Sequence, residues 1–154
     1  MLLKRKKPKS KTPIVFKLSV ADQEKLKAPP HKSLAALKAG THTATDWFNV
    51  TFRIKVGYEL AKAAYTQEAV DGMLDTLHAC LSIRARYLAT LRWSVTEEDL
   101  SLLELGIETT DLMQDDTTRR DQLSAHHTAR TYVHELLNAN WTHTKKVTLC
   151  AQLF

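Results

Sequence analysis

Residues 44–91 read ATDWFNVTFRIKVGYELAKAAYTQEAVDGMLDTLHACLSIRARYLATL, and this stretch decides the fold. Its second half carries a series at alternating steps of four and three residues: Val70, Leu74, Leu77, Leu81, Arg84, Leu88 and Leu91. Since an α-helix turns once every 3.6 residues, this spacing places the series on one helical face. The first half has a similar stripe of Trp47, Val50, Ile54, Ala61 and Ala64. With a break at Thr66-Gln67, the pattern predicts two amphipathic helices that pack antiparallel and need further apolar cover.

Two more helices are predicted after residue 91. Ser94 to Glu97 matches a capping box, and Thr96 followed by three acids is an equally good helix start. The last helix is predicted over residues 117–138. The helix in the first half of residues 44–91 is predicted to begin at Thr43 or Thr45, with a strand over residues 48–56 as the alternative because of its β-branched content.

The ends of the chain differ from this helical pattern. Residues 14–20 (IVFKLSV) and 147–154 (VTLCAQLF) alternate as half-buried strands do. Residues 21–27 are predicted to form two helical turns that end at Pro29-Pro30, and residues 28–43 are predicted to be irregular. We therefore expect a mainly α protein: a four-helix antiparallel bundle in one domain (14–154), a flexible basic arm (1–13), and short strand-like segments near both termini.

Positive charge is concentrated in the arm. Residues 1–13 contain six cations and no acid: Lys4, Arg5, Lys6, Lys7, Lys9 and Lys11. The net charge of the whole chain is +5, so taking away the arm's +6 leaves −1 for the remaining residues. Flexible cations of this kind neutralise phosphates and release counterions, without reading sequence. The arm therefore predicts nucleic-acid contact, with a solubilising tail or a tail that binds an acidic protein as the other interpretations.

A second indication is the unit Phe16-Lys-Leu-Ser-Val-Ala-Asp-Gln-Glu-Lys-Leu26, an alternating segment followed at once by a helix start. It resembles the beginning of ribbon-helix-helix repressors, over these residues alone. The resemblance implies a dimeric DNA reader in which Lys17 and Ser19 face the groove.

A further basic face is predicted on the two helices of residues 44–91 and just after them. Its cations are Arg53, Lys55, Arg84, Arg86 and Arg92. Tyr87 and Trp93 lie among them and could stack on bases. The other interpretation is a set of solvated helix faces whose charge is offset by the acids of residues 97–108.

Other chemistries find little support in the sequence. The chain has seven histidines, but no Glu-x-x-His, no His-Glu-x-x-His and no paired cysteines, so we expect no metal and no cofactor. Cys80 is expected to be buried and inert, and no nucleophile elbow or glycine-rich phosphate loop is present. No signal peptide or membrane-length apolar run is visible, which favours a cytoplasmic protein, or a nuclear one in a eukaryote.

The sequence thus favours a non-enzymatic, nucleic-acid-associated accessory or regulatory protein. The arm would contact DNA or RNA phosphates while the bundle forms a dimer or recruits a partner. The alternative is a protein–protein interaction module, such as an inhibitor, adaptor or assembly factor, that does not bind nucleic acid.

Overall fold

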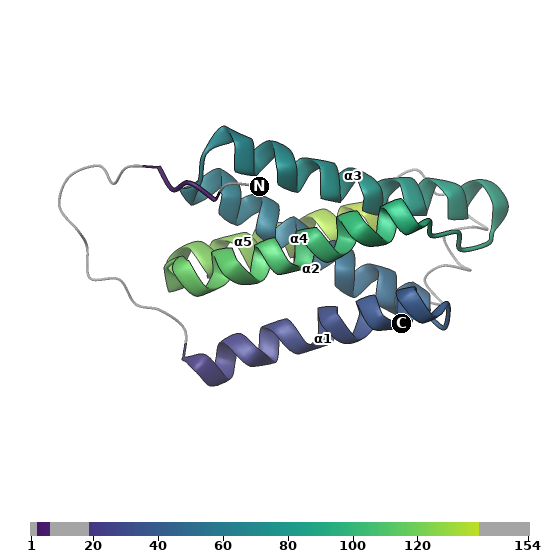
Figure 1. Ribbon diagram of the computed structural model, residues 1–154, viewed down its shortest axis with the longest axis horizontal. Coiled ribbons are helices and arrows are strands. Elements are labelled where there is room, and N and C mark those ends of the chain that lie inside the picture. The colour runs from purple at the N-terminus through teal and green to yellow at the C-terminus, as the bar shows by residue number, and fades with distance from the viewer. Residues whose placement is uncertain (1–2, 7–18, 139–154) are drawn as a thin grey trace.

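The computed structural model describes residues 3–6 and 19–138, and these form five helices and no strand beyond one isolated bridge (Figure 1). The helices are α1 (Val20–Ala39), α2 (Ala44–Ala64), α3 (Gln67–Thr90), α4 (Glu97–Asp116) and α5 (Arg119–Asn138). The mainly helical class is confirmed, but the predicted count of four helices is wrong. Residues 14–18 and 147–154, predicted to be strand-like, lie outside the described residues.

The additional helix is α1, which runs through Pro29 and Pro30. Each proline lacks the N–H that would bond four residues back, so an isolated helix would break at this point. In the folded chain, Pro30, Leu34 and Leu37 are buried, and α1 packs against both α2 and α4. This packing holds the backbone helical until Gly40, whose φ of 70° ends the helix. The prediction of irregular structure over residues 28–39 is therefore wrong.

The helix α2 is the central element, because it packs against each of the other four helices. Figure 1 shows α1 and α3 at opposite edges of the bundle, with α2, α4 and α5 between them. Residues 50–51 and 53–57 of α2 are all buried. Burial on every side offsets the low helix propensity of Val50, Ile54 and Val56, and the alternative of a strand over residues 48–56 is wrong.

Threonines precede α2, α3 and α4 as N-caps, and the sequence predicts those of α2 and α4. The N–H of Thr43 donates to Asp46 Oδ2 at 2.8 Å. Thr96 forms a complete capping box, since its N–H donates to Asp99 Oδ2 at 2.8 Å and its Oγ1 accepts from the N–H of Asp99 at 3.1 Å. These short-range contacts fix where α2 and α4 begin.

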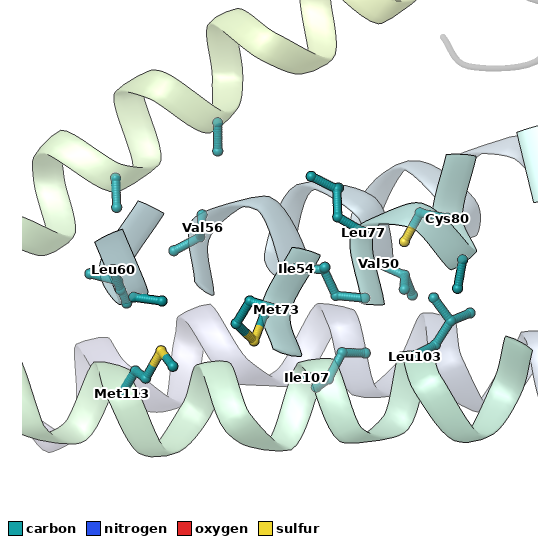
Figure 2. Close-up of a cluster of buried hydrophobic side chains, with 14 of the residues drawn as sticks. Val50, Ile54, Val56, Leu60, Met73, Leu77, Cys80, Leu103, Ile107 and Met113 are labelled. Carbon is teal, nitrogen blue, oxygen red and sulfur yellow. The ribbon is translucent and has the colours of Figure 1, made fainter. Parts of the chain in front are cut away.

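The core is filled by side chains of α2, α3 and α4 (Figure 2). Those labelled in the figure are Val50, Ile54, Val56, Leu60, Met73, Leu77, Cys80, Leu103, Ile107 and Met113. In α3 the buried face includes Val70 and Leu77 of the predicted stripe but extends beyond it to Met73, Cys80 and Ile83, which are fully buried. The face is wide because α3 packs against both α2 and α4.

The helix α5 covers α2 with small residues. Ala125, Ala129 and Val133 are buried, whereas Leu123 is 59% exposed. No described helix combines the length and hydropathy needed to span a membrane.

Candidate functional site

Residues 3–6 lie against the junction of α2 and α3. An antiparallel bridge joins Arg5 to Tyr65: the N–H of Lys6 donates to the carbonyl of Ala64 at 3.0 Å, and the N–H of Thr66 donates to the carbonyl of Lys4 at 2.8 Å. The first four N–H and last four C=O groups of a helix lack partners inside the helix. The segment therefore satisfies polar groups that the ends of α2 and α3 leave free.

The side chains of this segment are held to different degrees. The guanidinium of Arg5 lies 3.5 Å from Asp116 and 5.9 Å from the centre of the Tyr65 ring. Lys6 Nζ donates to the carbonyl of Lys62 at 3.2 Å, which leaves its charge unpaired by any described carboxylate. Burial, reinforced by Asp116, raises the pKa of Tyr65 to about 12. Of the other residues predicted to bind nucleic acid, Lys7, Lys9 and Lys11 of the arm and Lys17 lie outside the described residues.

Arg53 is not on the surface. It is 1% exposed, and its Nε and Nη2 donate to Asp111 Oδ1 at 3.2 and 2.6 Å while its Nη1 donates to Gln114 Oε1 at 2.5 Å. Burial lowers the pKa of Arg53, although Asp111 acts against this shift. On the other side, Asp111 Oδ2 lies 2.6 Å from His31 Nε2. The group ties α1, α2 and α4 together.

Lys55 faces α5 from the other side of α2. Its Nζ donates to Glu59 at 2.6 Å and lies 4.6 Å from the ring centres of both Tyr58 and Tyr132. Glu59 also accepts from Lys62 at 3.0 Å. Burial raises the pKa of Glu59, but hydrogen bonds from the two lysines outweigh it, and the pKa is lowered. The charge of Lys55 is therefore matched within the fold.

The three cations of α3 and the following loop also point to separate places. Arg84 Nη2 donates to the carbonyl of Leu136 in α5 at 3.1 Å. Arg86 pairs with Asp99 of α4 and donates from Nε to the carbonyl of Ser94 at 3.0 Å. Arg92 is exposed. The five residues predicted as one basic face thus contact different helices and are not brought together.

Tyr87 and Trp93, predicted to lie among these cations, stack on each other with ring centres 4.3 Å apart. Trp93 also lies near Trp47, at 6.1 Å, and meets the edge of His42 at 6.0 Å. Tyr87 is 3% exposed, so these rings close one end of the bundle and are not a platform for bases.

The described residues contain no group of three or more His, Cys, Asp or Glu side chains placed to hold a metal ion. His126 donates from Nδ1 to the carbonyl of Gln122 at 2.7 Å, and burial lowers the pKa of this histidine. Cys80 is buried as predicted, and burial raises the pKa of its thiol to about 12. At neutral pH it is therefore protonated and unreactive.

A surface that sequence reasoning missed runs between α3 and α4. Two hollows of about 570 Å³ each share Asp75 and Leu102 and so form one continuous groove. Its carboxylates are Glu68, Asp71 and Asp75 of α3 and Glu98 and Asp99 of α4, and its apolar wall includes Leu102 and Leu105. We call this surface the acidic groove.

A signal for the acidic groove was present in the sequence. From Glu97 to Asp116 there are acids but no Lys or Arg. Leu105 and Leu112 are two helical turns apart, on a face that the core-forming Leu103 and Ile107 do not share. Read together, these features indicate a helix with an acidic, partly apolar outer face.

The comparisons with known proteins identify no relative: no family model, curated protein or solved structure matches this chain.

Proposed function

We propose that the protein is a non-enzymatic, nucleic-acid-associated accessory protein that binds phosphates through one basic end of the bundle. The observation that carries the proposal is the bridge between Arg5 and Tyr65, because Lys4, Arg5 and Lys6 lie at the junction of α2 and α3. The protein would act in the cytoplasm, or in the nucleus if its host is eukaryotic.

Further cations extend this basic end. Arg5 pairs with Asp116, and Arg119 follows Asp116 by three residues, so the Cα atoms of Asp116 and Arg119 are within about 11 Å of each other. Arg119 and Arg120 are both exposed at the start of α5. Within the described part of the chain, neither arginine forms an ion pair, and neither do Lys4 and Lys6. These charges therefore remain available to phosphates.

Three of the acids near this end are engaged, whereas Glu68 and Asp121 form no ion pair within the described residues. Asp116 pairs with Arg5, Asp115 pairs with Lys27 at 2.7 Å, and Glu59 pairs with two lysines. A phosphate backbone approaching this end would consequently meet few free carboxylates. The arrangement favours contacts to phosphate, which provide affinity but no sequence specificity.

The test is substitution and not truncation, because removing residues 3–6 would also remove their backbone hydrogen bonds. Fluorescence anisotropy would measure binding of the full chain to duplex DNA, single-stranded DNA and RNA at 50 and 200 mM salt. The variant Lys7→Gln/Lys9→Gln/Lys11→Gln should bind more weakly. The slope of log K against log salt should fall by about 0.9 for each duplex phosphate that the variant no longer neutralises.

A matched control removes three exposed cations elsewhere: Lys25→Gln/Lys32→Gln/Arg130→Gln. It should retain more affinity and a steeper salt slope than the arm variant. Absence of binding at 50 mM salt, or an equal loss of nucleic-acid affinity in the two triple variants, would contradict the proposal.

A protein–protein interaction module is the second candidate, and the acidic groove is the observation that favours it. The groove repels polyanions and offers leucine side chains to a protein. Failure of the nucleic-acid experiment would leave this candidate in first place.

A further inference from the structure

The acidic groove has an apolar wall that the fold leaves uncovered. Leu102 is half-buried, and Leu105 is 41% exposed. Leu112, 60% exposed, continues the same face of α4 two turns further on. An amphipathic helix binds a groove of this kind by laying its own apolar face on the apolar side chains of the groove.

The length of the groove also suits a helix. Along α3 it extends from Glu68 to Arg86, which is about 27 Å at 1.5 Å per residue. A partner helix of about 18 residues would span it. Neither α1 nor α5 contributes to its lining, so the groove is open on the side away from these helices.

The negative charge of the acidic groove favours a cationic partner. Five carboxylates and one arginine, Arg86, line the groove, so its formal charge is −5 plus 1, or −4. The opposite side of α4 is different, because Glu104, Asp111 and Asp115 pair there with Lys38, Arg53 and Lys27. Within the described residues, Glu68, Asp75 and Glu98 form no ion pair. Cationic side chains of a partner could therefore pair with these carboxylates.

Part of this arrangement is unfavourable for the free protein, although Asp99 caps α4 and Asp71 accepts a hydrogen bond from Gln67. Glu68, Asp71 and Asp75 repeat at three and four residues on one face of α3, where like charges destabilise a helix by about 0.2–0.5 kcal/mol per pair. Surfaces that bind partners commonly keep features that lower the stability of the free protein.

We propose that the acidic groove binds a cationic amphipathic helix of a partner protein. Leucine-type side chains of that helix would pack on Leu102, Leu105 and Leu112, and its lysines or arginines would reach Asp71, Asp75 and Glu98. This inference does not depend on whether the basic end binds nucleic acid.

The probe is an 18-residue fluorescent peptide with Leu at helical i, i+3, i+4, i+7 spacing and Lys at the other positions. Two matched peptides replace Lys by Glu, or scramble the Lys/Leu order. Anisotropy with the full chain in 0.15 M salt should show binding of the first peptide, and at least tenfold weaker binding of the other two.

Variants of the protein locate the binding. Asp71→Lys/Asp75→Lys and, separately, Leu105→Asp should each lower the affinity for the Lys/Leu peptide at least tenfold. The control Glu24→Lys/Glu135→Lys changes the net charge by the same amount as the Asp71/Asp75 variant, at exposed positions outside the groove. It should lower the affinity for the Lys/Leu peptide less than threefold. Circular dichroism would confirm that every variant is folded.

Two results would overturn the proposal. One is equal weakening by the groove variants and the Glu24/Glu135 control, because the peptide would then respond only to net charge. The other is a dimer in sedimentation analysis that Leu105→Asp dissociates, because a second copy of the chain would then occupy the groove.

Discussion

Asp111 accepts hydrogen bonds from a guanidinium that has almost no contact with water. A buried, unpaired cation is strongly unfavourable, and Asp111 supplies the carboxylate that Arg53 meets, at 2.6 Å. The half-exposed pair of Lys38 and Glu104 is also short, at 2.5 Å, but solvent screens it. The same chemical pairing should therefore contribute very differently at the two places.

We expect Asp111→Asn to lower the free energy of unfolding by roughly 3 kcal/mol, because the substitution leaves Arg53 charged and buried without this counter-charge. Urea denaturation of the full chain would measure it. The control Glu104→Gln should lose no more than about 1 kcal/mol. Similar losses in the two variants would show that burial of Arg53 does not matter.

The sequence alone does not predict this difference between the Arg53–Asp111 and Lys38–Glu104 pairs. Arg53 was assigned to a basic face because it lies on the same helix as Lys55. Its partners Asp111 and Gln114 come from 58 and 61 residues away, and only the packing of α2 against α4 brings them together. By contrast, burial of Cys80 was predicted correctly, because the apolar periodicity around it is a local signal.

Between elements, α2 and α4 approach each other closely at Gly57. A Cβ at this position would lie 2.0 Å from Thr110 Oγ1, 3.0 Å from Thr110 Cβ and 2.7 Å from Met73 Cε. Gly106 of α4 is close to Thr76 of α3 in the same way, with 2.8 Å between its Cβ position and Thr76 Oγ1. Glycines thus let three helices approach one another closely.

Gly57→Ala should lower the free energy of unfolding by about 1–3 kcal/mol, since overpacking of the helix contact exceeds the gain in helix propensity. Thermal and urea unfolding would measure the change. The double variant Gly57→Ala/Thr110→Ala, compared with Thr110→Ala alone, should show a smaller loss, because the nearest atom is gone. An increase in stability on Gly57→Ala would contradict the close approach.

Among the helices, some features depend on residues close in sequence and others depend on packing between helices. The threonine caps of α2 and α4 depend on residues within three positions of each other, so the sequence predicts them. The continuation of α1 through Pro29-Pro30 depends on packing against α2 and α4, and local rules give the opposite answer. The acidic groove was missed because it needs two helices side by side.

At the scale of the whole molecule, residues 3–6 lie against the end of α2 and the start of α3 and form hydrogen bonds there. Leu3 packs against the core, and two backbone hydrogen bonds connect Lys4 and Lys6 to Thr66 and Ala64. The sequence predicts a charged arm here and gives no sign of this contact, because backbone groups hold it and its side chains are mostly hydrophilic. The basic segment therefore has a structural role that is separate from its charge.

Deletion of residues 1–6 should lower the free energy of unfolding by about 2–4 kcal/mol, since each backbone hydrogen bond contributes about 1 kcal/mol and Leu3 contributes its buried apolar area. The variant Lys4→Gln/Arg5→Gln/Lys6→Gln retains the backbone and Leu3, and should lose no more than about 1 kcal/mol, because the pair of Arg5 with Asp116 is half-exposed. Urea denaturation at neutral pH would compare the two. Equal losses would mean that side-chain charge holds the segment in place, and in that case the same lysines could not also be free for phosphate.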